Sequence, residues 1–136
     1  MRDFSTLRSG TLIKVDVHGI HDAIVIDAVP GVGAVIIICG TSKSRDYPEQ
    51  AQIEPSSPTG RRWGLTQTTY FFPSGVRVIS DPELVKSQHG FCEQEKFAQV
   101  REVVEAAAAR HSAASAHESS VQAFDSAKPP GSAAST

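Results

Sequence analysis

Residues 11–41 read TLIKVDVHGIHDAIVIDAVPGVGAVIIICGT, and their apolar patterns predict three consecutive β-strands. From Leu12 to Val17 apolar and polar residues alternate, which is typical of a strand with one buried face. Segment 23–28 is apolar at nearly every position, which favours a strand buried on both faces. Segment 34–39 is rich in β-branched side chains and predicts a third, central strand. Glycine-containing segments between them supply the turns.

The remaining sequence predicts further short strands and one helix. The expected strands are 49–53, 67–72 and 76–79; the other expected elements are an exposed loop at 54–64, a short helical turn at 80–85 and a helix at 93–109. The breakers Pro73-Ser74-Gly75 separate the last two strands. Phe97, Val100 and Val104 give the helix one apolar stripe. Strands followed by a helix indicate a mainly β fold, a small antiparallel β-barrel or curled sheet.

The composition indicates one domain followed by a low-complexity tail. The chain has 136 residues, 40% of them hydrophobic, and its net charge of −2 excludes an overall basic nucleic-acid-binding surface. More than half of residues 106–136 are Ala or Ser, so this segment buries too little apolar area to offset its ordering entropy. We therefore expect a lead-in at 1–9, a domain at 10–105, and the end of the helix with a disordered tail at 106–136.

The cysteines and apolar runs bear on the compartment. Cys39 and Cys92 are too few for the disulfide framework of a small secreted domain. Charged residues interrupt any secretory signal near the start, and the longest apolar run, 32–39, is far shorter than the ~20 residues that span a membrane. We expect a cytoplasmic protein with no membrane partner.

Six segments follow one another in a characteristic order. They are GTLIKVDV at 10–17, AIVI at 23–26, IIICGTS at 36–42, the basic KSRDYP at 43–48, GL at 64–65 and HGF at 89–91. Their order and spacing resemble the PemK/MazF-like toxin family over most of residues 10–105. The resemblance implies a small SH3-like β-barrel that forms a homodimer. It also implies cleavage of single-stranded RNA without a metal, and a cognate antitoxin as partner.

Two positions carry the chemistry that this resemblance implies. In the family, a Thr at the end of the third strand and an Arg beside the second act in RNA cleavage, in which the 2′-hydroxyl attacks its own phosphate. The Thr corresponds to Thr41, whose hydroxyl can donate to a phosphate oxygen. The Arg position holds His21, and Asp22 stands where the family has Pro.

Two interpretations of His21 stay open. In the first, His21 replaces the Arg as general acid or base, because an imidazole changes charge near neutral pH. In the second, the catalytic centre has decayed and His21 is an ordinary residue at a strand edge. The carboxylate of Asp22 favours the second, since it repels phosphate. The connection 18–22 is also shorter than the loop that covers the RNA groove in many relatives, and the basic loop 54–64 is a candidate to compensate.

Positive charge gathers in two segments. Lys43 and Arg45 lie in one, and Arg61, Arg62 and Trp63 lie in the other. Cations for phosphates and aromatic rings for base stacking are what single-stranded RNA binding requires. These five residues are therefore the candidate RNA-binding residues. The competing interpretation is a solvated loop anchored by one tryptophan.

The sequence indicates neither a cofactor nor a metal. His18, His21 and Asp22 lie close along the chain, but no second cluster supplies the remaining ligands of a metal site. Two functions compete. The first is a metal-independent endoribonuclease of a toxin–antitoxin system, with His21 and Thr41 as catalytic residues. The second is a catalytically degenerate barrel that binds RNA or a protein.

Overall fold

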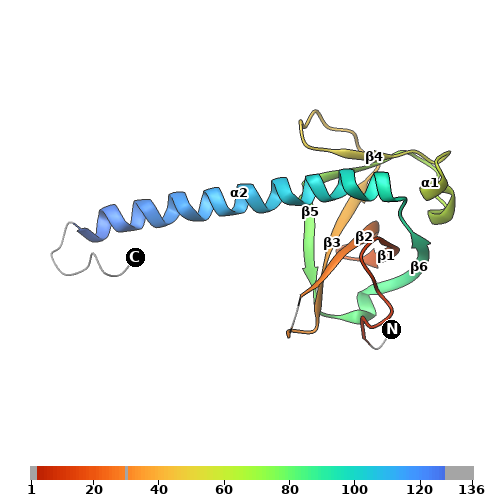
Figure 1. The fold of residues 1–136 in the computed structure, drawn as a ribbon, viewed down its shortest axis with the longest axis horizontal. Coiled ribbons are helices and arrows are strands. Elements are labelled where there is room, and N and C mark those ends of the chain that lie inside the picture. The colour runs from red at the N-terminus through yellow and green to blue at the C-terminus, as the bar shows by residue number, and fades with distance from the viewer. Residues whose placement is uncertain (1–2, 30, 128–136) are drawn as a thin grey trace. The chain divides into compact units, whose positions relative to one another are not determined.

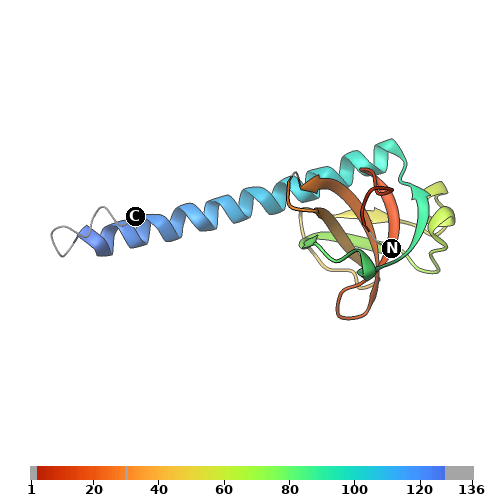
Figure 2. The ribbon, with the colours of Figure 1, turned by 90° about the horizontal axis from the view of Figure 1, so that it is seen from below.

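Six antiparallel strands form one curled sheet in the computed structural model (Figure 1), which describes residues 3–29 and 31–127, with side chains up to residue 110. The strand order is β4-β5-β3-β2-β1-β6. Figure 2 shows the curl of the sheet from below. The chain divides into two units, Met1–Val104 and Glu105–Thr136, of which the first holds the sheet. The predicted mainly β fold with a C-terminal helix is confirmed.

The strands are β1 Thr11–Asp16, β2 Ile20–Val29, β3 Ala34–Thr41, β4 Ala51–Ile53, β5 Thr69–Ile79 and β6 Val85–Phe91. The helices are α1 Pro58–Trp63, the 3₁₀ turn η1 Pro82–Leu84 and α2 Gln94–Ala127. Strand β3 lies inside the sheet, between β5 and β2, as its β-branched sequence predicts.

Strand β5 differs from the prediction of two strands separated by a turn. Both of its ends pair with β3 in the same antiparallel direction, Arg77 with Ile37 and Tyr70 with Thr41. Between these pairs, residues 72–75 of β5 lie opposite the single residue Cys39 of β3. The breakers of this segment therefore form a bulge within one strand and do not reverse the chain.

The prediction of an exposed loop at 54–64 is wrong for its second half, which forms helix α1. The Ser57 hydroxyl accepts a hydrogen bond from Gly60 N at 3.0 Å, and Pro58 follows it in the first turn. Gly64 ends the helix in a left-handed conformation, with φ of 73°. Ser-Pro favours the start of a helix and Gly favours its end. The six residues between these signals are enough for a short helix.

Strand β6 was not predicted, because its sequence VKSQHGF is largely polar. It pairs antiparallel with β1 at the edge of the sheet, and Val85 is its buried residue. The short helical turn predicted before it is confirmed: the Asp81 carboxylate accepts a hydrogen bond from Glu83 N at 3.0 Å and caps η1.

Helix α2 continues beyond its predicted end at Ala109 to Ala127. Alanine is the strongest helix former, and neither Pro nor Gly interrupts this segment, so the backbone is helical without an apolar stripe. The predicted end of the helix and tail covers 106–136; its backbone is helical up to Ala127, and residues 128–136 lie outside the described residues. Among the described residues, no helix combines the length with the continuous apolar sequence that a membrane span requires.

The sheet buries apolar side chains on both faces, as the nearly continuous apolar sequences of β2 and β3 predict. One cluster contains Leu12, Ile24, Ile38, Trp63, Phe71, Val100 and Val103. The other contains Ile13, Val15, Ala23, Val25, Val35, Ile37, Ile79 and Val85. Phe97 and Val104 pack against the first cluster, so the predicted stripe of α2 is confirmed over its first turns.

Candidate functional site

Two hollows at the ends of β2 and β3 share the residues His21, Gly40 and Thr41. The larger has a volume of about 400 Å³ and is also lined by Ser42, Leu65, Thr66, Gln67 and Thr69, beside Ile20 and Asp22. The smaller, of about 170 Å³, is also lined by Cys39, Arg45, Phe72, Ser74, Gly75 and Arg77. Because they share three residues, we treat the two hollows together as one feature, the groove.

The register of β2 on β3 brings the two predicted catalytic residues together. Ala23 pairs with Cys39 in this antiparallel ladder, and continuing it by two residues places His21 opposite Thr41. Directly opposite residues have Cβ atoms about 5 Å apart. Both side chains are half-buried, so they are positioned by the sheet and still open to the groove.

Glycine at position 40 allows β3 and β5 to approach closely beside Thr41. A Cβ atom there would lie 2.4 Å from Thr69 Cγ2 and 2.9 Å from Phe71 Cε1. A side chain at position 40 would therefore have to displace the Thr69 methyl group and the Phe71 ring, so the packing of these side chains beside Thr41 favours glycine here.

The Thr41 hydroxyl has a fixed orientation. Its Oγ1 accepts a hydrogen bond from Lys43 N at 3.1 Å. A hydroxyl that accepts one hydrogen bond still carries its own hydrogen. Thr41 can therefore donate to an anion in the groove, as the sequence predicts for a phosphate oxygen.

Asp22 is paired with a lysine. Lys14 lies opposite Asp22 in the β1–β2 ladder, and Lys14 Nζ is 2.5 Å from Asp22 Oδ1. The sequence interpretation treated Asp22 as a charge that repels phosphate. Because the ammonium of Lys14 opposes that charge at short range, the repulsion of phosphate by Asp22 is a weaker argument for a decayed site.

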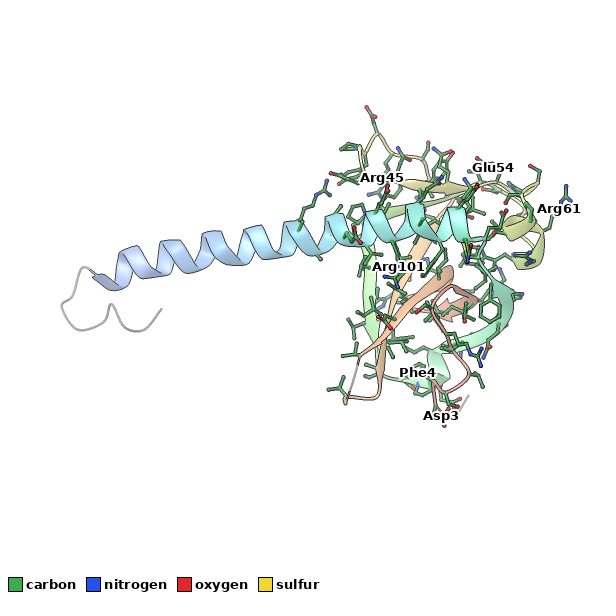
Figure 3. The ribbon with its side chains drawn as sticks, in the orientation of Figure 1. Asp3, Phe4, Arg45, Glu54, Arg61 and Arg101 are labelled. Atoms are coloured by element: carbon green, nitrogen blue, oxygen red, sulfur yellow. The ribbon has the colours of Figure 1, made fainter. Side chains whose placement is uncertain are left out.

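The five predicted RNA-binding residues lie in two different places. Arg45 lines the groove, and Lys43 is exposed two residues after Thr41. Arg61 and Arg62 lie on α1 and line neither hollow; Figure 3 shows Arg45 and Arg61 well apart. Arg62 Nη1 donates to the carbonyl of Phe91 at 2.8 Å, so its guanidinium links α1 to β6.

Trp63 is a core residue, contrary to the prediction that it stacks on RNA bases. Its side chain is 1% exposed, and its ring is stacked on Phe71 with centroids 5.9 Å apart. Its Nε1–H donates to the Ile13 carbonyl at 3.1 Å. A ring enclosed in this way offers no face to a base. The reason is α1, which the sequence interpretation missed and which turns this side chain inward.

Sequence reasoning also missed two groups at the groove. Arg77 lines the smaller hollow, and it was overlooked because β5 was divided at the bulge. Phe72 lines the same hollow, and the ring of Tyr47 lies 5.5 Å from it. Tyr47 is 38% exposed and so presents an aromatic surface beside Arg45.

Cys39 adds a thiol to the wall of the groove. Burial raises the pKa of this thiol, and the positive charge of Arg77 opposes the rise. The thiol is therefore protonated at neutral pH and contributes no negative charge to the groove. Within the part of the chain that the structure describes, no three His, Cys, Asp or Glu side chains gather to form a metal-binding cluster.

No family model matches the sequence, and no curated protein matches it. Solved structures match the fold. The Mycobacterium tuberculosis toxin MazF-mt6 is 12% identical, with a TM-score of 0.57 over 71% of this chain and 94% of that one.

Two further solved structures agree with this match. An endoribonuclease in complex with its cognate antitoxin from mycobacterial species is 16% identical, with a TM-score of 0.58 over 76% of this chain and 94% of that one. A MazE–MazF structure from Deinococcus radiodurans is 16% identical, with a TM-score of 0.53 over 72% of this chain and 90% of that one. Over most of its length, the chain has the fold of the MazF toxins.

Proposed function

We propose that the protein is a toxin-like endoribonuclease that cleaves single-stranded RNA in the groove without a metal ion. The observation that carries the proposal is the convergence of His21 and Thr41, from two different strands, on the same pair of hollows. An imidazole and a hydroxyl facing one hollow supply a proton acceptor and a hydrogen-bond donor, which is what 2′-hydroxyl attack on a phosphate requires. The MazF fold supports the same reaction class.

In this reaction His21 accepts the proton of the 2′-hydroxyl as the 2′-oxygen bonds to phosphorus. The bond from phosphorus to the 5′-oxygen breaks, and that oxygen takes a proton from water. The products are a 2′,3′-cyclic phosphate and a free 5′-hydroxyl. Thr41 donates its hydroxyl hydrogen to a non-bridging oxygen, whose negative charge grows in the transition state.

Binding of the strand on either side of the reacting phosphate falls to groups near Thr41. Lys43 and Arg45 carry the positive charge that holds neighbouring phosphates. The exposed ring of Tyr47 is placed to stack on an unpaired base. Arg61 and Arg62 would contact only RNA that extends from the groove to α1.

We further propose a second copy of this chain and an antitoxin as protein partners. The support is the fold: one of the similar structures is an endoribonuclease in complex with its cognate antitoxin. Light scattering on the purified protein tests the homodimer. Copurification with the product of a neighbouring gene, and loss of RNA cleavage in that complex, test the antitoxin.

The test of the enzymatic proposal is incubation of the purified protein with a long single-stranded RNA in EDTA. We expect cuts that leave 2′,3′-cyclic phosphate ends, and their loss in Thr41→Ala and in His21→Ala. His18→Asn is the matched control: it removes a histidine that lines neither hollow and keeps a residue that tolerates the positive φ of 54° at this position.

Intact RNA together with measurable binding of RNA would refute the enzyme and assign the groove to a binding module. Cuts that persist unchanged in both variants would show that the activity does not use these residues. Activity lost equally in His18→Asn would show that the loss reflects the fold and not the groove.

A further inference from the structure

Arg77 is a cation in the groove that takes no part in the reaction proposed for His21 and Thr41. It lies on β5 opposite Ile37, on the sheet face that the second core cluster occupies. It lines the smaller hollow together with His21, Thr41 and Arg45. Among the described residues, Arg45 and Arg77 are the two cationic side chains that line this hollow.

The guanidinium of Arg77 is held in place by the bulge of β5. Its Nη1 donates to the carbonyl of Ser74 at 2.6 Å and to that of Val76 at 2.9 Å. An arginine side chain has five N–H donors in a rigid planar fork. With Nη1 engaged, the Nη2 and Nε hydrogens are the donors that remain for an anion. By comparison, the structure shows no side-chain hydrogen bond for Arg45 among the described residues.

The bulge itself depends on the sequence at this point. A Cβ atom on Gly75 would lie 2.4 Å from the carbonyl oxygen of Cys39, so the close contact of the bulge with β3 requires glycine. Bulges commonly re-aim side chains next to functional sites. Here the bulge places Ser74, whose carbonyl accepts one of these hydrogen bonds, and Arg77 on the wall of one hollow.

The charge of Arg77 acts within the groove. It lowers the pKa of the Cys39 thiol against the rise that burial causes, and Cys39 lines the same hollow. His21, Thr41 and Cys39 line the same hollow. A guanidinium whose charge affects the Cys39 thiol therefore also attracts an anion bound between His21 and Thr41.

We propose that Arg77 binds the phosphate seated between His21 and Thr41 and stabilises the charge of its phosphorane transition state. This inference rests on the proposed function. As the 2′-oxygen bonds to phosphorus and the 5′-oxygen leaves, two non-bridging oxygens gain negative charge, and a fork of N–H donors stabilises them in parallel. His21 then serves only as the proton acceptor. Because an imidazole must be neutral to accept a proton, it carries no positive charge at the start of the reaction, and Arg77 supplies that charge.

The test compares Arg77→Ala and Arg77→Lys with Arg101→Ala. Arg101 is a matched control because its guanidinium lies over the Phe97 ring on α2, 5.2 Å from the centroid, and lines neither hollow. Three quantities are measured: kcat and KM on single-stranded RNA in EDTA, the salt dependence of Kd for an all-deoxy single strand of the same sequence, and the thermal unfolding transition. The deoxy strand lacks the attacking hydroxyl and stays intact.

We expect Arg77→Ala to lower kcat by about 10²–10³-fold, the loss typical of one transition-state donor. The salt slope of log Kd should fall by about 0.7, the value for one phosphate contact on a single strand. Added guanidinium ion at concentrations that leave the unfolding transition unchanged should restore part of kcat in Arg77→Ala, and Arg77→Lys should retain the salt slope but only part of kcat.

The outcomes separate this inference from the proposed function. Wild-type cleavage with Arg77→Ala indistinguishable from Arg101→Ala overturns the inference and leaves the function standing. Loss of kcat that parallels loss of thermal stability and is not rescued by guanidinium assigns Arg77 to the bulge alone, which also overturns it. If the wild type does not cleave RNA, the proposed function is refuted, and binding of the deoxy strand tests Arg77 separately. A smaller salt slope in Arg77→Ala alone would still show that Arg77 binds a phosphate. Equal slopes in Arg77→Ala and Arg101→Ala would refute that role.

Discussion

The groove and the region of α1 hold the same kinds of residue but use them differently. Each contains an arginine, an aromatic residue and a cysteine: Arg62, Trp63 and Cys92 around α1, and Arg77, Phe72 and Cys39 in the groove. Around α1, the N–H donors of Trp63 and Arg62 end on carbonyls of β1 and β6, so they join parts of the fold. In the groove, Thr41 and Arg77 are oriented by backbone groups and keep donors that face a hollow. The two regions therefore differ in the partners of their N–H and O–H donors and not in their residue types. Donors bonded to backbone carbonyls stabilise the fold, and donors that face a hollow are available to a ligand.

The largest change that we expect in any variant is a loss of stability on replacement of Trp63, which tests its structural role. Replacing Trp63 with Ala empties a fully buried site and leaves the Ile13 carbonyl without its donor. We expect a loss of about 3–5 kcal/mol in the free energy of unfolding, measured by denaturant titration. Trp63→Phe should lose less, because it keeps an aromatic ring against Phe71.

The control for Trp63 is Arg61→Ala on the same helix. Arg61 is exposed, so its removal should change the free energy of unfolding by less than about 0.5 kcal/mol. If Trp63→Phe remained folded yet lost most of its affinity for single-stranded RNA, the base-stacking role first predicted for Trp63 would return.

The second effect concerns the bulge. Gly75→Ala places a Cβ atom 2.4 Å from the Cys39 carbonyl oxygen, so β3 and β5 must separate locally. We expect a cost of about 1–3 kcal/mol in stability. Since a displacement of about 1 Å in a catalytic group costs up to about 100-fold in rate, kcat for RNA should fall far more than the stability loss explains.

Gly31→Ala provides the comparison for Gly75→Ala. Gly31 has a φ of 79° and no atom within 4 Å of an added Cβ, and it lies in the turn between β2 and β3, outside the groove. Its replacement should cost about 1 kcal/mol through backbone strain and leave kcat unchanged. Equal kcat losses in the two variants would show that the bulge does not position the groove.

These two sites also show how far the sequence could predict the structure. The apolar patterns of β1, β2 and β3 predict which faces are buried, whereas Thr41 and His21 were identified as site residues through the resemblance to the toxin family. The bulge and α1 were missed because Pro, Ser and Gly signal a break without saying whether the chain turns, bulges or starts a helix. That outcome depends on long-range contacts such as Gly75 with Cys39 and Trp63 with Ile13, which no local pattern contains.

The third prediction compares the alkylation rates of Cys92 near α1 and Cys39 in the groove. Burial raises the pKa of Cys92 to about 11 from 9.0, Glu93 adds to the rise, and Thr59 and Arg62 oppose it. Because only the thiolate reacts, Cys92 in the Cys39→Ser variant should alkylate about 100-fold more slowly at pH 8 than in the urea-unfolded chain. Its rate should keep rising towards pH 11, whereas the rate in the unfolded chain levels off above about pH 9.

Cys39 in the Cys92→Ser variant completes this measurement. Its pKa is also raised by burial, but the charge of Arg77 works against the rise, and the residue borders an open hollow. We therefore expect Cys39 to react faster than Cys92, and Arg77→Ala to slow it. Iodoacetamide labelling followed by mass spectrometry gives both rates. Equal rates for the two cysteines, or no effect of Arg77, would contradict the electrostatic contrast between the regions.

The smallest expected effect decides how far bound RNA extends. Lys43→Ala with Arg45→Ala removes two cations next to Thr41, and Arg61→Ala with Arg62→Ala removes two from α1. On a single strand each phosphate contact contributes about 0.7 to the slope of log Kd against log salt concentration. The first pair should lower the slope by about 1.4. The second should leave it unchanged, because Arg62 is engaged with β6 and neither arginine lines the groove. An equal fall in both slopes would mean that the strand runs from the groove onto α1, and the two regions would then form one RNA-binding surface despite their different side-chain contacts.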